Sequence, residues 1–312
     1  MKPFYRTHNQ YLKERFPYRV YKIPIDAGFT CPNIDGTVAY GGCTYCDNKS
    51  FSPNARTAPR PVRDQVAEGM EFYRERFGAE KFIVYFQAFT NTHGPVEHLR
   101  RLYDESLISN DIVGLAIGTR PDSVPEAVLD LLAEYSARFR VWVEYGLQSI
   151  HDDIMDRLNR GHSYAQFTDA VRRTKRRGLP VCAHVILGLP GETPEMMMQT
   201  ADAVAALGID AVKIHHFYIA RNTALEKTHR VTPVPTFTLE EYIARVCDFI
   251  ERMPPETVIE RVMGELNPAF VVSPLWKKSK GEILMRIEDE FSRRGTGQGF
   301  RRVRAASGQT SS

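Results

Sequence analysis

The fold of this chain is constrained most by a regular alternation of short apolar runs, rich in β-branched residues, with longer stretches of helical periodicity. Such runs are typical of strands covered on both faces, and the stretches between them are long enough for helical crossovers between parallel strands. Six units occur in succession, and we expect their strands at residues 21–25, 81–86, 113–117, 141–147, 181–189 and 211–217. Because such crossovers are right-handed, the series should curl into an α/β partial barrel, two units short of a closed eightfold barrel.

The alternation stops after residue 217. Later patterns predict a shorter set of elements: a helix near 239–253, a strand near 257–262 and a helix near 281–293. We therefore divide the chain into four parts: an N-terminal arm at 1–20, the barrel at 21–220, a small C-terminal α/β extension that closes the barrel at 221–293, and a disordered basic tail at 294–312.

The composition is that of an ordinary globular protein, since 43% of the 312 residues are hydrophobic and 25% are charged. Charged residues break every apolar run before it reaches the roughly 18 residues of a membrane span, so we expect no membrane association. The first residues lack the apolar segment of a secretory signal, which predicts a cytoplasmic protein. Five cysteines, three of them crowded together, are too few and too uneven for a disulfide framework.

Both ends of the chain are basic. Residues 1–22 carry six Lys and Arg against one Glu, interleaved with aromatic residues, and residues 292–312 carry five Arg and no acid. Basic and aromatic side chains together can bind phosphates and stack on bases, as an RNA-binding segment requires. The alternative is that the aromatic residues of the arm pack onto the domain while its charges stay in solvent.

The loop at residues 31–46 contains Cys31, Cys43 and Cys46. Three thiolates in one loop can hold three corners of a 4Fe–4S cluster, for which cysteine is the usual ligand, and leave the fourth iron without a protein ligand. Structural zinc takes four protein ligands, so a zinc site would need His8 or Asp47 in addition. Unmetallated thiols are the third possibility. The cluster accounts best for three ligands without a fourth.

The stretch "GFTCPNIDGTVAYGGCTYC", residues 28–46, resembles the cluster loop of radical S-adenosylmethionine (radical SAM) enzymes. Its long first spacing is similar to that of the branch containing the radical subunit of Elongator, to which the oxygen-independent coproporphyrinogen oxidases are related. Residues 5–293 as a whole most resemble the small bacterial YhcC-like family. The resemblance implies a partial (β/α)6 radical SAM barrel, a 4Fe–4S cluster on the three loop cysteines, and S-adenosylmethionine as the second cofactor.

The resemblance also implies a set of residues that bind S-adenosylmethionine: Tyr45, Gln87, Arg120, Glu144, Gln148, Arg160, Gly188 and Gly191. Tyr45 stands where family members have the aromatic residue near the adenine. Arg160 stands where they have an Arg that contacts the methionine carboxylate. Gln87 follows the second strand, where the family has a Gly-Gly-Glu-like turn, so this chain departs from the family there.

Some of these residues also have a structural explanation. Glu144 and Gln148 are four apart in the fourth strand and should face the same side, where a carboxylate can accept from two ribose hydroxyls. The alternative for Glu144 is a buried acid paired with a neighbouring Arg. Arg160 could instead pair with Asp156, four residues earlier.

Three histidines are candidates for catalysis. His184 lies in the fifth strand, and His215 and His216 end the sixth, near the barrel mouth where active sites of βα barrels lie. They could act as acid, base or substrate contact, and one of the adjacent pair should face inward. The alternative is that each is a hydrogen-bonded structural histidine.

The resemblance implies an enzyme that reductively cleaves S-adenosylmethionine to a 5′-deoxyadenosyl radical, which takes a hydrogen atom from a substrate. It also implies a one-electron donor, such as flavodoxin or ferredoxin, as a partner. The Elongator branch and the basic ends favour tRNA, at a wobble uridine, as the substrate. Two alternatives stay open: a radical SAM oxidoreductase for a small metabolite or porphyrin-like substrate, and a zinc-containing, non-catalytic RNA-binding module.

Overall fold

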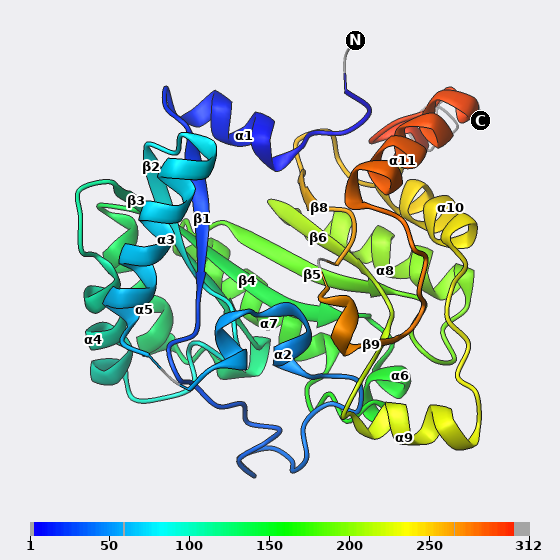
Figure 1. The fold of residues 1–312 in the computed structure, drawn as a ribbon, viewed down its shortest axis with the longest axis horizontal. Helices are drawn as coiled ribbons and strands as arrows, with labels where there is room; N and C mark the ends of the chain where they lie inside the picture. Colours follow the sequence, from blue (N-terminus) through cyan, green and yellow to red (C-terminus); the bar gives the residue numbers. More distant parts are fainter. Residues whose placement is uncertain (1–2, 59, 265, 303–312) are drawn as a thin grey trace.

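The main sheet of the protein has seven parallel strands in the order β1-β2-β3-β4-β5-β6-β8 and curls into a half-barrel (Figure 1). The computed structural model describes residues 3–58, 60–264 and 266–302. The strands are β1 Val20–Ile25, β2 Lys81–Phe86, β3 Ile112–Thr119, β4 Arg140–Gln148, β5 Val181–Leu187, β6 Ala211–His216 and β8 Val258–Arg261. The first six fall within two residues of the predicted positions at each end, and the predicted partial barrel is confirmed.

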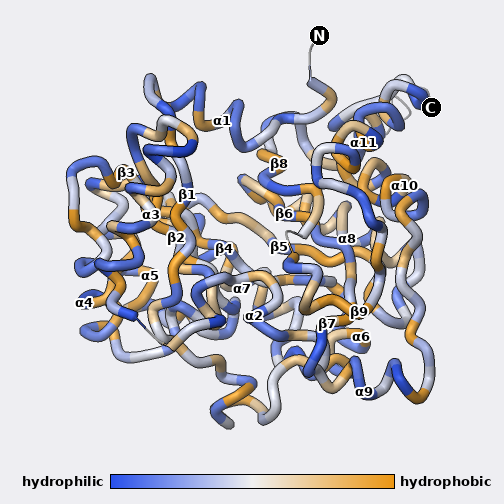
Figure 2. Tube along the Cα trace, viewed as in Figure 1, coloured by the Kyte–Doolittle hydropathy of each residue, from blue (hydrophilic) through white to orange (hydrophobic). Residues whose placement is uncertain are grey.

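Helices surround this sheet, and most of them pack on its outer face. The described helices are α1 His8–Arg15, α2 Asn48–Phe51, α3 Val62–Phe77, α4 Val96–Ser106, α5 Glu126–Ser136, α6 Asp152–Arg157, α7 Tyr164–Arg176, α8 Pro194–Ala206, α9 Ala224–Val231, α10 Leu239–Ile250 and α11 Lys280–Arg294. Figure 2 shows apolar residues running along the strands and polar residues on the peripheral turns. Buried apolar side chains of strands and helices form one large core between the two layers. No helix in the described part of the chain combines the length and the apolarity needed to cross a bilayer.

The C-terminal region contributes a strand to the barrel. β8 pairs in parallel with β6, and Ala211 lies opposite Val258. A separate antiparallel pair, β7 Ile219–Ala220 and β9 Val271–Ser273, was not expected from the sequence. The division expected at residue 220 therefore runs through one continuous sheet.

The polar stretch at residues 294–302 belongs to the folded domain, in contrast to the disorder that its composition predicted. Arg294 is the last residue of α11. The backbone N–H of Gln298 donates to the carbonyl of Phe4 at 2.9 Å, and Arg301 Nε donates to Glu251 Oε2 at 2.7 Å. The stretch is ordered because its donors find buried acceptors, which composition does not reveal. The rest of the predicted tail, residues 303–312, lies outside the described residues.

The N-terminal arm packs onto the domain. Tyr11 and Leu12 of α1 are buried, and the Tyr11 ring meets Trp142 edge-on with 5.6 Å between centroids. The Tyr11 hydroxyl accepts a hydrogen bond from Arg140 Nε at 3.0 Å. In Figure 1, α1 lies across the top of the half-barrel, at the amino ends of the strands. Tyr11 and Leu12 of α1 therefore help to close that end, as the packing alternative proposed.

Replacing Tyr11 with alanine should destabilise the protein by about 3–5 kcal/mol, because it leaves a cavity where a buried aromatic ring was. Lys13→Ala on the same helix, where the side chain is exposed, should change stability by less than about 0.5 kcal/mol. Urea unfolding of both variants measures this difference. Equal unfolding midpoints for Tyr11→Ala and wild type would show that α1 does not close the barrel.

Candidate active site

The cysteine loop lies between β1 and α2, at the end of the half-barrel opposite α1 (Figure 1). Gly41 and Gly42 have φ angles of 81° and 76°, a left-handed conformation that favours glycine, and they turn the chain back toward Cys43. The N–H of Cys46 bonds to the carbonyl of Cys43 at 3.0 Å, and the N–H of Ile34 bonds to that of Cys31 at 2.7 Å. These bonds fold the loop into a compact turn around its thiols.

The three thiols lie close enough to influence one another's ionisation. Loss of contact with water raises the pKa of the Cys46 thiol, the nearby Cys43 and Cys31 thiols raise it further, and the charge of Arg160 lowers it. Three thiolates so close together need positive charge beside them, and bound iron would supply it. His8, one of the two residues considered as a fourth zinc ligand, lies at the other end of the barrel, 3.9 Å from Glu260.

Two nitrogen donors point at the sulfur of Cys43. Asn33 Nδ2 lies 3.6 Å from Cys43 Sγ, and Arg160 Nη1 lies 3.7 Å from the same atom. Asn33 is fully buried, and its amide also donates to the carbonyl of Arg160 at 2.8 Å. N–H groups aimed at a ligand sulfur are the contacts that stabilise an iron–sulfur cluster. Sequence reasoning missed Asn33, although it lies only two residues after Cys31.

Arg160 is held beside the loop by backbone groups. Its Nη2 donates to the carbonyl of Gly146 at 2.7 Å, and its buried Nε has no hydrogen-bond partner among the described residues. The predicted alternative, an ion pair with Asp156, is not formed within that part of the chain. A buried guanidinium with an unused donor fits an incoming oxygen ligand, as the prediction of a carboxylate contact requires.

Arg120, directly after β3, supports Arg160. Its guanidinium pairs with both carboxylate oxygens of Asp122, at 2.9 and 2.7 Å, and donates to the carbonyl of Arg160 at 2.7 Å. These contacts occupy the guanidinium, so Arg120 positions the turn that carries Arg160. A direct contact of Arg120 with the cofactor stays a prediction.

Gly146 makes room for two predicted cofactor residues. A Cβ at this position would lie 2.6 Å from Arg160 Nη2 and 2.9 Å from Gln148 Nε2. Gln148 itself follows a bulge in β4 and has a φ of 72°, so the four-residue spacing from Glu144 does not place the two on one regular strand face. A glycine inside a buried strand is a sequence signal of close approach.

Four more of the predicted cofactor residues are Tyr45, Gln87, Gly188 and Gly191. Tyr45 is half-buried beside Cys43, and Gln87 lines a cleft described below. A Cβ on Gly188 would meet the Phe237 ring at 2.6 Å, so this glycine admits Phe237 from the segment before α10. A Cβ on Gly191 would have ordinary contacts with Arg157 and Ile154 at 3.4 Å, but its φ of 86° favours glycine.

Glu144 lies in the barrel interior with its carboxylate already paired. Lys22 Nζ lies 2.9 Å from Oε1, while His184 Nε2 lies 2.9 Å from Oε2 and Lys213 pairs with the same oxygen. The predicted alternative of a paired buried acid is therefore found, with lysines in place of an Arg. A further contact of Glu144 with the ribose stays a prediction.

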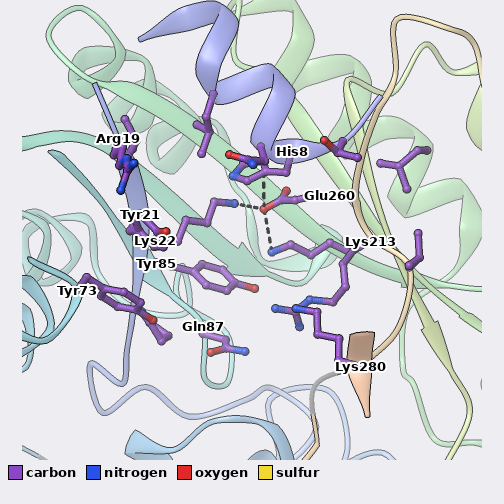
Figure 3. Close-up of a pocket in the computed structure, with 18 of the residues that line it drawn as sticks. His8, Arg19, Tyr21, Lys22, Tyr73, Tyr85, Gln87, Lys213, Glu260 and Lys280 are labelled. Carbon is purple, nitrogen blue, oxygen red and sulfur yellow. Dashed lines mark hydrogen bonds and ion pairs between the residues drawn. The ribbon is translucent and has the colours of Figure 1, made fainter. Parts of the chain in front are cut away.

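A second acid joins this group. Glu260 pairs with Lys22 and lies 3.5 Å from Lys213 Nζ, and Figure 3 shows the three side chains converging. Burial acts to raise the pKa of both acids, but Lys213 and Lys22 outweigh it, holding Glu144 well below its usual range and Glu260 at about 2. We call Lys22, Glu144, Lys213 and Glu260 the ion cluster. Its charges balance.

Ligand atoms of Glu144, Cys182 and His184 lie within 4.8 Å of one another, a spacing that a metal ion could bridge. The two lysines on Glu144 already neutralise it and would repel a cation. We assign no metal to this place.

The three candidate histidines are divided between the two faces of the sheet. His184 and His215 lie together, with 5.8 Å between ring centroids. His216 lies on the other face of β6, 4.5 Å from the Trp276 ring and 5.5 Å from Tyr242. Burial lowers the pKa of His216 to about 4 and that of His215 well below its usual range, so both are neutral at pH 7. The structure does not bring His216 to the other two.

A cleft of about 1360 Å³ opens between β1 and β8, the two edge strands of the half-barrel. It reaches from α1 past the ion cluster to Gln87 (Figure 3). Its lining includes seven Lys and Arg: Lys13, Arg19, Lys22, Arg56, Lys213, Arg261 and Lys280. Two acids, Glu80 and Glu260, and seven Tyr and Phe complete the charged and aromatic part of the described lining.

The fold and the cysteine loop together define a radical SAM enzyme. The family model "Radical SAM superfamily" matches residues 38–204, and "Radical_SAM C-terminal domain" matches residues 209–293. The chain belongs to the radical SAM superfamily, and it therefore takes a 4Fe–4S cluster and S-adenosylmethionine as cofactors, as its loop predicted.

Relatives place the chain within this superfamily. It is 39% identical over 295 residues to YtqA of Bacillus subtilis, which covers 95% of this chain and 92% of YtqA. It is 35% identical over 285 residues to YhcC of Escherichia coli, covering 91% of each. The structure of Elp3 from Methanocaldococcus infernus superposes with a TM-score of 0.69 at 19% identity, covering 90% of this chain and 64% of that one. The predicted YhcC-like relationship is confirmed.

Replacing Glu144 with alanine should destabilise the protein by roughly 3–5 kcal/mol, because it leaves two buried lysines without this partner. Asp153→Ala removes an exposed pair with Arg157 at 3.2 Å and should cost less than about 0.5 kcal/mol. Urea denaturation of the two variants provides the comparison. Normal stability with lost S-adenosylmethionine binding would mean that Glu144 serves the cofactor and not the fold.

Asn33→Leu should lower the midpoint potential of the cluster by roughly 20–60 mV, because the lost N–H···S bond no longer favours the more negative, reduced state. That range corresponds to about 0.5–1.5 kcal/mol, the net value of one hydrogen bond. Redox titration followed by electron paramagnetic resonance measures it, with iron content checked first. Asn110→Leu, an exposed position before β3, should leave the potential unchanged, and an unchanged potential in Asn33→Leu would contradict this role.

Proposed function

We propose that this radical SAM enzyme modifies a base of tRNA, with the wobble uridine as its target. The observation that carries the proposal is the cleft between β1 and β8, where seven basic residues meet two acids and seven aromatic rings. Cations along a groove follow a phosphate backbone, and aromatic rings provide surfaces on which bases stack. A cleft for a small neutral metabolite would not need this excess of positive charge.

Similarity to tRNA enzymes supports the same substrate. The chain is 31% identical over 187 residues to the tRNA uridine(34) acetyltransferase of Dehalococcoides mccartyi, a match that covers 58% of this chain and 39% of that enzyme. It is 24% identical over 192 residues to Elongator complex protein 3 of Saccharomyces cerevisiae. These matches cover only part of each protein, so the shared part supports the radical chemistry and suggests the substrate.

The residues of this chain would divide the work. Cys31, Cys43 and Cys46 hold the cluster, and the buried guanidinium of Arg160 orients the carboxylate of S-adenosylmethionine. When bound, the two cofactors supply a carbon radical that removes a hydrogen atom from the substrate. The cleft admits the RNA strand from the open edge of the barrel. A flavodoxin or ferredoxin would supply the electron.

The proposal is tested by mass spectrometry of tRNA nucleosides from cells with and without the gene. A nucleoside that disappears with the gene, and that the reconstituted enzyme forms on unmodified tRNA with reductant and S-adenosylmethionine, is the expected result. Cys43→Ala should abolish both the nucleoside and 5′-deoxyadenosine. Unchanged nucleosides, together with 5′-deoxyadenosine formation stimulated by a small metabolite, would replace the tRNA proposal with the metabolite alternative.

Removing two cations at the outer part of the cleft should weaken tRNA binding and its salt dependence. For Lys13→Ala/Arg19→Ala we expect the slope of log affinity against log salt to become shallower by roughly 1.5, since each phosphate contact contributes about 0.7–0.9. Arg172→Ala/Arg176→Ala removes the same charge from exposed positions of α7 and should leave the slope unchanged. Fluorescence anisotropy with labelled tRNA measures both, and equal slopes would exclude the cleft as the RNA path.

A further inference from the structure

Arg261, at the end of β8, is a cation in the interior of the half-barrel that pairs with no residue the structure describes. It lines the cleft and is half-buried, and no described residue forms a hydrogen bond or ion pair with its guanidinium. The other two cations at this depth, Lys22 and Lys213, are paired with Glu144 and Glu260. Because the four charges of the ion cluster balance, Arg261 leaves the inner part of the cleft with one uncompensated positive charge.

Other unused polar groups gather around this charge. Tyr85 lies beside Lys213, whose Nζ is 4.2 Å from the ring centroid, and no described residue bonds to the Tyr85 hydroxyl. Figure 3 shows that hydroxyl pointing into the cleft. His215 Nε2 is buried and likewise lacks a partner among the described residues. Burial raises the pKa of the Tyr85 hydroxyl well above its usual range, and the charge of Arg261 opposes that rise. Burial, followed by the charge of Arg261, lowers the pKa of His215 well below its usual range.

We propose that Arg261 and Tyr85 form an oxyanion site that binds one phosphate of the RNA strand at the inner end of the cleft. This rests on the proposed function. A guanidinium binds two oxygens of a phosphate through parallel N–H bonds, and a tyrosine hydroxyl can donate to a third. A phosphate fits better than an isolated carboxylate because two further cations, Lys13 and Arg19, line the same cleft toward α1.

This site would position the RNA and would not take part in the radical chemistry. A phosphate fixed between β8 and β2 leaves the neighbouring nucleoside to extend toward the carboxyl ends of the strands, where the cysteine loop lies. A base that enters the barrel must leave its stack, and an anchored phosphate helps to hold the strand in that conformation.

The test uses the full-length, cluster-loaded enzyme and a labelled five-residue oligouridylate as the probe. Arg261→Gln should weaken binding about tenfold and make the salt slope shallower by about 0.7, the share of one phosphate on a single strand. Arg261→Lys keeps the charge but not the fork and should recover only part of the affinity. Arg172→Gln, an exposed control on α7, should bind like wild type.

A second measurement separates binding from a structural role. Because Arg261 has no partner among the described residues, Arg261→Gln should keep the thermal midpoint and the S-adenosylmethionine affinity of wild type. A lowered midpoint with unchanged oligouridylate binding would make Arg261 a structural residue and overturn the proposal.

The remaining outcomes distinguish the two proposals. If wild type binds oligouridylate and Arg261→Gln binds it equally well, the oxyanion site is wrong while the tRNA function stands. If wild type binds neither tRNA nor oligouridylate, the proposed function itself fails. Stabilisation of wild type by inorganic phosphate or uridine monophosphate without oligouridylate binding, lost in Arg261→Gln, would assign the site to a small phosphorylated molecule and reject the RNA strand.

Discussion

The half-barrel depends on the ion cluster that spans its open edge. β1 and β8 lie at opposite ends of the sheet order, so no ladder of backbone hydrogen bonds joins them. Lys22 of β1 instead pairs with Glu260 of β8, and both are tied to β4 and β6 through Glu144 and Lys213. Side-chain charges thus connect strands that backbone bonds leave apart. Such a connection is favourable only while every member is paired, because desolvating a single buried charge costs several kcal/mol.

The same arrangement keeps the edge open. A closed barrel would fill its interior with apolar layers, whereas paired charges and a separate helix, α1, leave the space between β1 and β8 accessible. The cysteine loop lies at the opposite end from α1, beside the turn that carries Arg160. Arg120 and Asn33 hold this turn by donating to the carbonyl of Arg160, and the Arg160 side chain donates to the carbonyl of Gly146. Helix α1 therefore closes one end of the half-barrel, while the gap between β1 and β8 gives access from the side. A large substrate can enter through this gap without disturbing the turn that supports the cysteine loop.

Much of the site could be predicted from residue type and spacing. The three loop cysteines led to the cluster, and the loop pattern led to the superfamily, because ligand chemistry restricts both residue type and distance along the chain. The strands were predictable since they are largely buried and mostly apolar. Lys22 and Lys213 also left a signal, a charge within an apolar strand, but their partner Glu260 is distant in sequence. Asn33, Gly146 and Phe237 matter through contacts across the fold that no local pattern encodes.

The sequence by itself determined the alternation of strands and helices and the partial barrel, since each follows from local periodicity. It also predicted the three cysteines of the cluster loop from their spacing. Only the tertiary structure decided which charges are paired. It showed that Glu144 is held by two lysines, that His215 and His216 face opposite sides of β6, and that residues 294–302 join the fold. The physical reason is that burial and charge pairing depend on distances between segments far apart in the chain, and those distances exist only once the sheet has curled.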